Sequence, residues 1–442
     1  MTAENHPPQT TGQLLGRSLQ AVGVTRIFGS SSSGISGIPG LGHLRIDEPV
    51  LASMLADAQG RISRGPGAAL LPGRRLRLSS QPGEVVVPVV LDDAALLPEA
   101  IASWSVGSVF GASELVLDLD LDAPAPAGVE PQVIDRVGQL MTLSPSLAEF
   151  TMLVLAGPGV VRDNQVEALR SFAAQAGVGV VNTWGAKGVF PWDDPHHFGT
   201  AGLQARDFEL AGFGEAQLVV AVGLDRDEAP RHLWSGAQVL EVEPFQLAAL
   251  AYNWPDPGEV PPYPALYTEL ARALEPLYES SRSPLTPARA ARDLSLVRPK
   301  GGLVAADPGP AGLWVARTFP TTEPGSVVVP SGYVEGFAVA AAMVASLDDR
   351  PAIAVTMAPF NPVVEALIDI AQPLSSRFVL CEWGADVQWS EATAHKVALR
   401  TALDSPGIAH IPTPIDFAQT QVLIDVAGEV VAWGADGGGD RG

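Results

Sequence analysis

Met152-Leu153-Val154-Leu155-Ala156 is followed directly by Gly157-Pro158-Gly159, and this stretch decides the fold. Five apolar residues that end at a glycine- and proline-rich turn are typical of a short strand buried on both faces. Residues 164–176 then have the periodicity of an amphipathic helix, and further strands are predicted at 178–182, 218–222 and 238–243. Strands that alternate with helices predict an open parallel α/β sheet of the Rossmann type.

The same alternation extends to both sides of this segment. Downstream, Thr286-Pro287 predicts a helix start, and strands are predicted at 303–306, 327–329, 352–356 and 378–381. Upstream, the pattern predicts a helix at 12–21 and a strand at 25–28. Residues 121–132 and 252–287 break the pattern with prolines and polar residues. We therefore predict three α/β domains with open parallel sheets, at 8–125, 133–275 and 284–430.

The composition of the 442 residues limits the partners of the chain. Asp and Glu number 49 against 27 Lys and Arg, so the net charge is −22 and the surface repels nucleic acid and anionic lipid. The longest apolar run, 337–347, is shorter than the roughly 20 residues that span a bilayer. The polar N-terminus lacks a signal-peptide pattern. We expect a cytoplasmic protein that binds neither nucleic acid nor membrane.

Three short motifs contain residue types that bind ligands. Gly157-x-Gly159 after a strand is either part of a dinucleotide-binding turn or a tight strand-to-helix turn, because it lacks a third glycine. Asp47 and Glu48 form a carboxylate pair that is either solvated or, if buried, suited to acid–base chemistry. His196 and His197 follow two aspartates, but adjacent side chains rarely face one ion, so we interpret this segment as a polar loop.

The order of landmarks along the chain resembles the thiamine-diphosphate enzyme family, and most closely its acetolactate-synthase and benzoylformate-decarboxylase branch. The most specific match is central, where Leu155-Ala156-Gly157-Pro158-Gly159 is followed by Thr183-Trp184-Gly185-Ala186-Lys187-Gly188 and then by His197-Phe198-Gly199-Thr200-Ala201-Gly202. The resemblance implies a pyrimidine-binding domain, a central domain and a diphosphate-binding domain. It also implies a site between two subunits, hence a homodimer or a dimer of dimers, with the apolar helix 337–347 as a candidate for part of the interface.

The resemblance also implies which residues form the site. Glu48 is the candidate for the catalytic glutamate that hydrogen-bonds the aminopyrimidine ring of the cofactor. The candidates for cofactor-binding residues in the third domain are Asp307, Gly309, Gly332, Gly336 and Glu382.

The chain departs from the family where the family holds its metal. A Gly-Asp-Gly triplet follows a buried strand in the family, whereas Met357-Ala358-Pro359 stands there in this chain. Ala358 has no side-chain oxygen for a hard cation, and Pro359 has no backbone N–H. Glu335 stands near the position of the bulky apolar residue that bends the cofactor, and Glu382 replaces a later asparagine. We therefore predict no metal site and expect no cofactor.

Three functions stay open at this point. The first is a degenerate thiamine-diphosphate-enzyme fold that is non-catalytic or altered in activity. The second is an active thiamine-diphosphate- and magnesium-dependent carboligase or decarboxylase of 2-oxo acids with an unusual cofactor site. The third is a protein that binds a nucleotide or another small ligand through its central domain. The missing metal carboxylate favours the first function.

Overall fold

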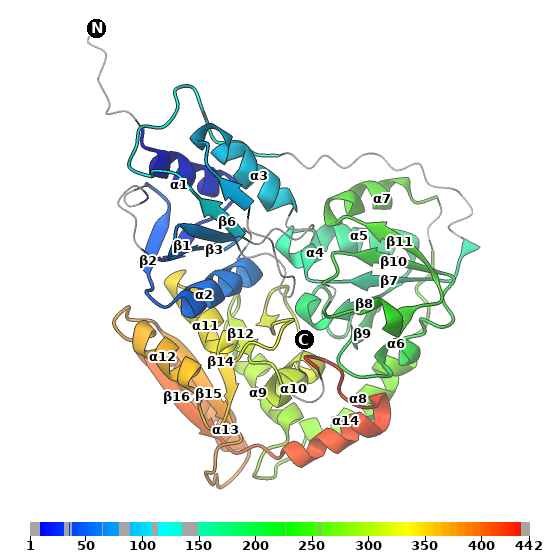
Figure 1. The fold of residues 1–442 in the computed structure, drawn as a ribbon. Helices are drawn as coiled ribbons and strands as arrows, with labels where there is room; N and C mark the ends of the chain where they lie inside the picture. The colour runs from blue at the N-terminus through cyan, green and yellow to red at the C-terminus, as the bar shows by residue number, and fades with distance from the viewer. Residues whose placement is uncertain are drawn as a thin grey trace. The chain divides into compact units, whose positions relative to one another are not determined.

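The computed structural model describes residues 9–30, 35, 38–63, 65–78, 89–107, 114–134, 149–225, 227–255 and 258–434. They divide into two compact units, Met1–Arg136 and Val137–Gly442 (Figure 1). The first unit holds one sheet and the second unit holds two. The predicted α/β class is confirmed, whereas the three predicted domain boundaries remain a prediction.

The first unit is a six-stranded sheet with the order β2-β1-β3-β4-β6-β5. Only β4 runs antiparallel to its neighbours among the described strands, a departure from the all-parallel sheet that the pattern predicts. Residues 72–74 form the three-residue loop between β3 and β4, in which Gly73 and Arg74 both have positive φ angles, 75° and 58°. Its elements are α1 (Thr11–Ala21), β1 (Arg26–Gly29), β2 (Gly42–Arg45), α2 (Pro49–Ile62), β3 (Ala68–Leu71), β4 (Arg75–Leu78), β5 (Val89–Leu91), α3 (Leu97–Gly107) and β6 (Glu114–Leu117).

The middle sheet of the chain is the first sheet of the second unit. It is fully parallel, with the order β11-β10-β7-β8-β9. Every residue of β7, β8, β9 and β10 is buried, and this burial explains the continuous apolar composition of β7 and β10. The elements are β7 (Met152–Ala156), α4 (Gly159–Arg162), α5 (Val166–Ala176), β8 (Gly179–Thr183), β9 (His197–Ala201), α6 (Asp207–Leu210), β10 (Leu218–Val222), β11 (Gln238–Val242), α7 (Leu247–Asn253) and α8 (Ala265–Tyr278).

The third sheet is also fully parallel, with the order β13-β12-β14-β15-β16. Thr286 caps α9 and accepts the N–H of Arg289, as the Thr-Pro pair predicts. The elements are α9 (Pro287–Val297), β12 (Leu303–Ala306), α10 (Pro310–Thr318), β13 (Val327–Val328), α11 (Phe337–Leu347), β14 (Ala352–Met357), α12 (Pro362–Ala371), β15 (Phe378–Trp383), α13 (Thr393–Asp404), β16 (Ile408–Thr413) and α14 (Thr420–Ala427).

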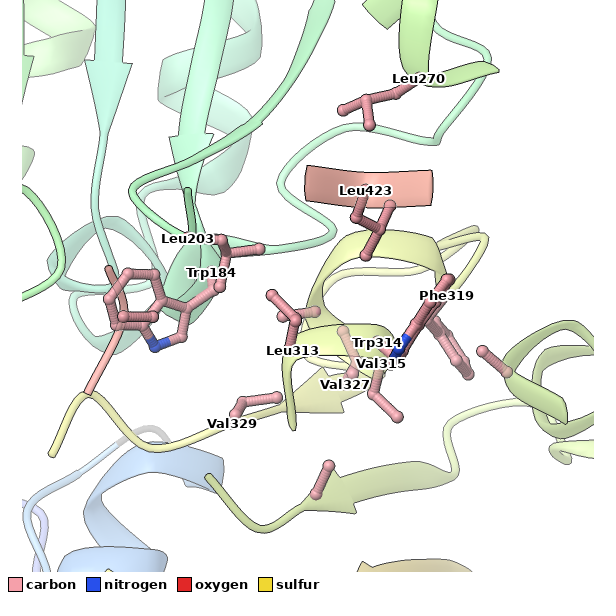
Figure 2. Close-up of a cluster of buried hydrophobic side chains, with 14 of the residues drawn as sticks. Trp184, Leu203, Leu270, Leu313, Trp314, Val315, Phe319, Val327, Val329 and Leu423 are labelled. Atoms are coloured by element: carbon pink, nitrogen blue, oxygen red, sulfur yellow. The ribbon is translucent and has the colours of Figure 1, made fainter. Parts of the chain in front are cut away.

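The middle and third sheets share one hydrophobic core, and this core explains why they form a single unit. Trp314 of α10 and Phe319, the residue after this helix, lie in the same buried cluster as Trp184, which follows β8, and Leu423 of α14 (Figure 2). Apolar surface buried against both sheets contributes about 25 cal/mol per Å² to stability. Helix α10 therefore joins the two sheets.

Two expectations need correction. His197 does not lie in a polar loop: it begins the edge strand β9 and is 6% exposed. Helix 337–347, the candidate for part of an interface, is α11, and its residues 337–345 are buried. It therefore presents no apolar face to solvent. Among the described residues, no helix is both long and apolar enough to cross a membrane.

Candidate functional site

The carboxyl ends of the third-sheet strands gather most of the predicted site residues. Asp307 follows β12, Gly332 and Gly336 lie between β13 and α11, and Glu382 is the penultimate residue of β15. In an open parallel sheet, ligands bind outside this edge. The region is therefore the first candidate for a site.

Asp307 is buried at this edge and uses both carboxylate oxygens within the protein. One oxygen accepts the N–H of Ala338 at 2.7 Å. The other accepts the N–H of Gly336 at 3.1 Å and the hydroxyl of Thr356 at 2.7 Å. Burial raises the pKa of Asp307 to about 6, although these three hydrogen bonds favour the carboxylate. Asp307 thus occupies the N–H groups at the start of α11 that a bound anion would need.

The Met357-Ala358-Pro359 turn at the end of β14 offers little to a diphosphate. The Ala358 N–H donates to the Trp383 carbonyl at 2.9 Å, so it continues the β14–β15 ladder. Pro359 has no N–H. The next polar side chain, Asn361, caps α12 by accepting the Val364 N–H at 2.9 Å. This turn therefore has neither the carboxylate nor the backbone donors that hold a metal and its phosphates.

The other carboxylates near this edge are paired. Glu335 accepts hydrogen bonds from Asn361 at 3.1 Å and from the Tyr333 hydroxyl at 3.2 Å. Glu382 lies 3.0 Å from Nε2 of His410 on β16. Among the described residues, no group of three His, Cys, Asp or Glu side chains is arranged to hold a metal ion. The residues present therefore do not fit a diphosphate held by magnesium, as in the family that the chain resembles.

The remaining predicted residues have mainly structural roles. Gly309 caps α10 with φ 91°, a left-handed conformation that glycine adopts without strain. Gly332 lies in the turn before α11. Glu48 is exposed and caps α2, where its side chain faces the Val50 N–H at 3.5 Å. Its catalytic role stays a prediction.

Sequence reasoning missed two residues of this edge, Thr356 and His410. Thr356 is the penultimate residue of β14. Its position beside the end of a predicted strand is the one sequence signal that could have identified it as a site residue. His410 comes to Glu382 only through the pairing of β15 with β16.

The middle sheet has its own candidate crevice, where the strand order reverses between β7 and β10. There the Gly157 and Gly159 turn packs directly on Gly223. A Cβ atom on Gly157 would lie 2.3 Å from the Gly223 carbonyl oxygen, and one on Gly159 would lie 2.7 Å from the Gly223 Cα. The N–H of Gly159 donates to that carbonyl at 2.8 Å, and the N–H of Gly157 donates to Val222. These backbone groups are used internally, which favours the tight-turn interpretation over a dinucleotide site.

Comparisons with known proteins agree with this fold. Residues 148–244 match the family model of the central domain of thiamine pyrophosphate enzymes. A solved structure of a putative thiamin diphosphate-dependent enzyme from Mycobacterium smegmatis is similar over 92% of this chain and 100% of its own, with a TM-score of 0.68 and 18% identity. No curated protein matches the chain. The resemblance is confirmed for the central segment, and the structural likeness confirms the fold.

Proposed function

We propose that this chain keeps the fold of thiamine-diphosphate enzymes without the metal-held cofactor, and that it is non-catalytic or altered in activity. The observation that carries this proposal is the turn after β14. It lacks a carboxylate at Ala358, the Ala358 N–H is bonded to Trp383, and Pro359 has no N–H. A diphosphate here would bring uncompensated negative charge beside Glu335 and Glu382, which costs free energy at short range.

The active alternative rests on the family model and on the fold. It requires thiamine diphosphate and magnesium to bind in the absence of the Gly-Asp-Gly triplet. If that occurs, Glu48 is the candidate catalytic carboxylate, and Glu48→Gln abolishes turnover. The nucleotide-binding alternative finds less support, because Gly223 closes the turn at Gly157 and Gly159.

Isothermal titration calorimetry with thiamine diphosphate and Mg²⁺ tests the proposal. We expect no saturable, magnesium-dependent heat and no decarboxylation of pyruvate or benzoylformate. The loss of a charged metal ligand costs several kcal/mol, and each 1.4 kcal/mol is about tenfold in affinity.

The matched control is the triple variant Met357→Gly, Ala358→Asp, Pro359→Gly, which rebuilds the triplet in the same protein. A gain of magnesium-dependent binding in this variant supports the proposal. Saturable binding by the unaltered chain that disappears when Mg²⁺ is removed would overturn it.

A further inference from the structure

Residues 428–433, which follow the last helix, form a segment that we call the C-terminal strap. The strap leaves α14 at Gly428, whose φ of 81° turns the chain out of the helix. It then runs antiparallel to residues 203–205, which follow β9, and Val430 of the strap pairs with Gln204. The chain thus returns from the third sheet to the edge of the middle sheet.

Hydrogen bonds hold the C-terminal strap in place, with little help from buried side chains. Two backbone bonds join it to residues 203–205, from the Ala205 N–H to the Glu429 carbonyl at 2.9 Å and from the Val431 N–H to the Leu203 carbonyl at 3.0 Å. The side chain of Gln204 also donates to the Gly428 carbonyl at 2.7 Å. Of the six strap residues, only Ala432 is buried. Segments with few buried apolar contacts open at a lower free energy than core strands.

Trp433 connects the C-terminal strap to the candidate edge of the third sheet. Its indole N–H donates to the Pro330 carbonyl at 2.8 Å, and the indole N–H of Trp184 donates to the same oxygen at 3.1 Å. The two indole rings lie 5.4 Å apart between their centroids. Pro330 follows β13 and begins the segment that contains Gly332 and Gly336. The strap therefore bonds directly to the segment between β13 and α11.

The backbone of Trp433 is strained in this position. Its φ is 60°, in the left-handed region that a bulky side chain rarely adopts. Such a conformation persists only where the surrounding contacts impose it, and it is found at switch regions. Here the imposing contacts are those of the indole with Trp184 and with the Pro330 carbonyl. Loss of these contacts releases the strain, which favours opening of the C-terminal strap.

We propose that the C-terminal strap opens and closes as a unit and controls the order of the segment between β13 and α11. In the closed state, Trp433 and Trp184 together fix the Pro330 carbonyl. In the open state, Pro330 keeps the Trp184 N–H alone of these two donors, and the segment that carries Gly332 and Gly336 gains freedom. This motion needs no ligand, so the proposal is independent of the proposed loss of the cofactor.

Native-state hydrogen exchange of the full chain, measured by mass spectrometry at low urea concentrations, tests whether the C-terminal strap opens locally. We expect the bonded amides of residues 203–206 and 429–433 to exchange together, roughly tenfold or more faster than those of the buried strand β14. Their rates should depend little on urea, because the opening exposes little surface. Exchange of both segments at the rate of β14 and with the same urea dependence would overturn the proposal.

The variant Trp433→Phe tests the control of the segment between β13 and α11. It keeps an aromatic ring beside Trp184 and removes the donor to Pro330. We expect exchange to become about fivefold faster in residues 203–206 and 330–337, the usual effect of one lost hydrogen bond, and to stay unchanged in β14. Trp192→Phe, at a side chain that is 48% exposed, is the matched control and should alter neither segment.

Unchanged exchange of residues 330–337 in the Trp433→Phe variant would show that the strap does not control this segment, and would overturn the proposal. If the variant does not fold, the urea dependence measured on the unaltered protein still decides whether the strap opens as a unit.

Discussion

At the scale of single residues, Asp307 makes the stability of the fold depend on pH. Its pKa is raised by burial from 3.8 to about 6, so between these values the folded state binds the proton more tightly than the unfolded state. Stability contributed by the protonated group is therefore present below about pH 4 and is lost as pH rises through about 6. The full effect is on the order of 2–3 kcal/mol.

Asp307→Asn removes this titration. Urea unfolding between pH 4 and pH 7 measures the pH dependence of stability in the variant and in the unaltered protein. We expect the unfolding midpoint of the variant to fall less steeply over this range than that of the unaltered protein. Asp369→Asn, at an exposed position on α12, is the matched control. Parallel pH profiles for the Asp307 variant and the unaltered protein would contradict the assignment.

At the scale of elements, one ion pair joins α6 of the middle sheet to α10. Asp207 is fully buried against Arg317, whereas Glu209, two residues later, forms an exposed pair with Arg206. Asp207→Ala leaves a buried guanidinium without its carboxylate, and we expect a loss of about 3–5 kcal/mol. Glu209→Ala should cost about 0.5 kcal/mol or less. Chemical denaturation measures both variants, and equal losses would show that the buried pair does not hold the two elements together.

At the scale of the whole molecule, we expect a homodimer or a dimer of dimers. The resemblance implies a site shared between subunits, and α11 is buried, so the surface that makes the contact lies elsewhere. Light scattering at micromolar concentration should give two or four times the chain mass of 46.0 kDa. A mass of one chain would contradict this prediction.

The sequence by itself determined the elements and the fold class of this protein. The strands at 218–222 and 303–306 and the helix at 337–347 have the predicted bounds, because continuous apolar runs and helical periodicity are local signals. The helix predicted at 164–176 begins later, at Val166, because Asn164, with a φ of 55°, lies between α4 and α5. Strand β9 escaped prediction because His197-Phe198-Gly199-Thr200-Ala201 has neither pattern. The absence of a metal carboxylate at Ala358 could also be read from the sequence alone.

Only the tertiary structure decided which polar groups are free. Asp307 bonds to Gly336 and Thr356, and Glu382 bonds to His410, across separations of 28 to 49 residues. Lys187 appears in the sequence as part of a short motif, but its burial, with 6% of the residue exposed, depends on the packing of the whole fold. Such contacts join segments far apart in the chain, and no local pattern encodes them. The free energy of a buried charge depends on all of these neighbours together, so it is a property of the fold.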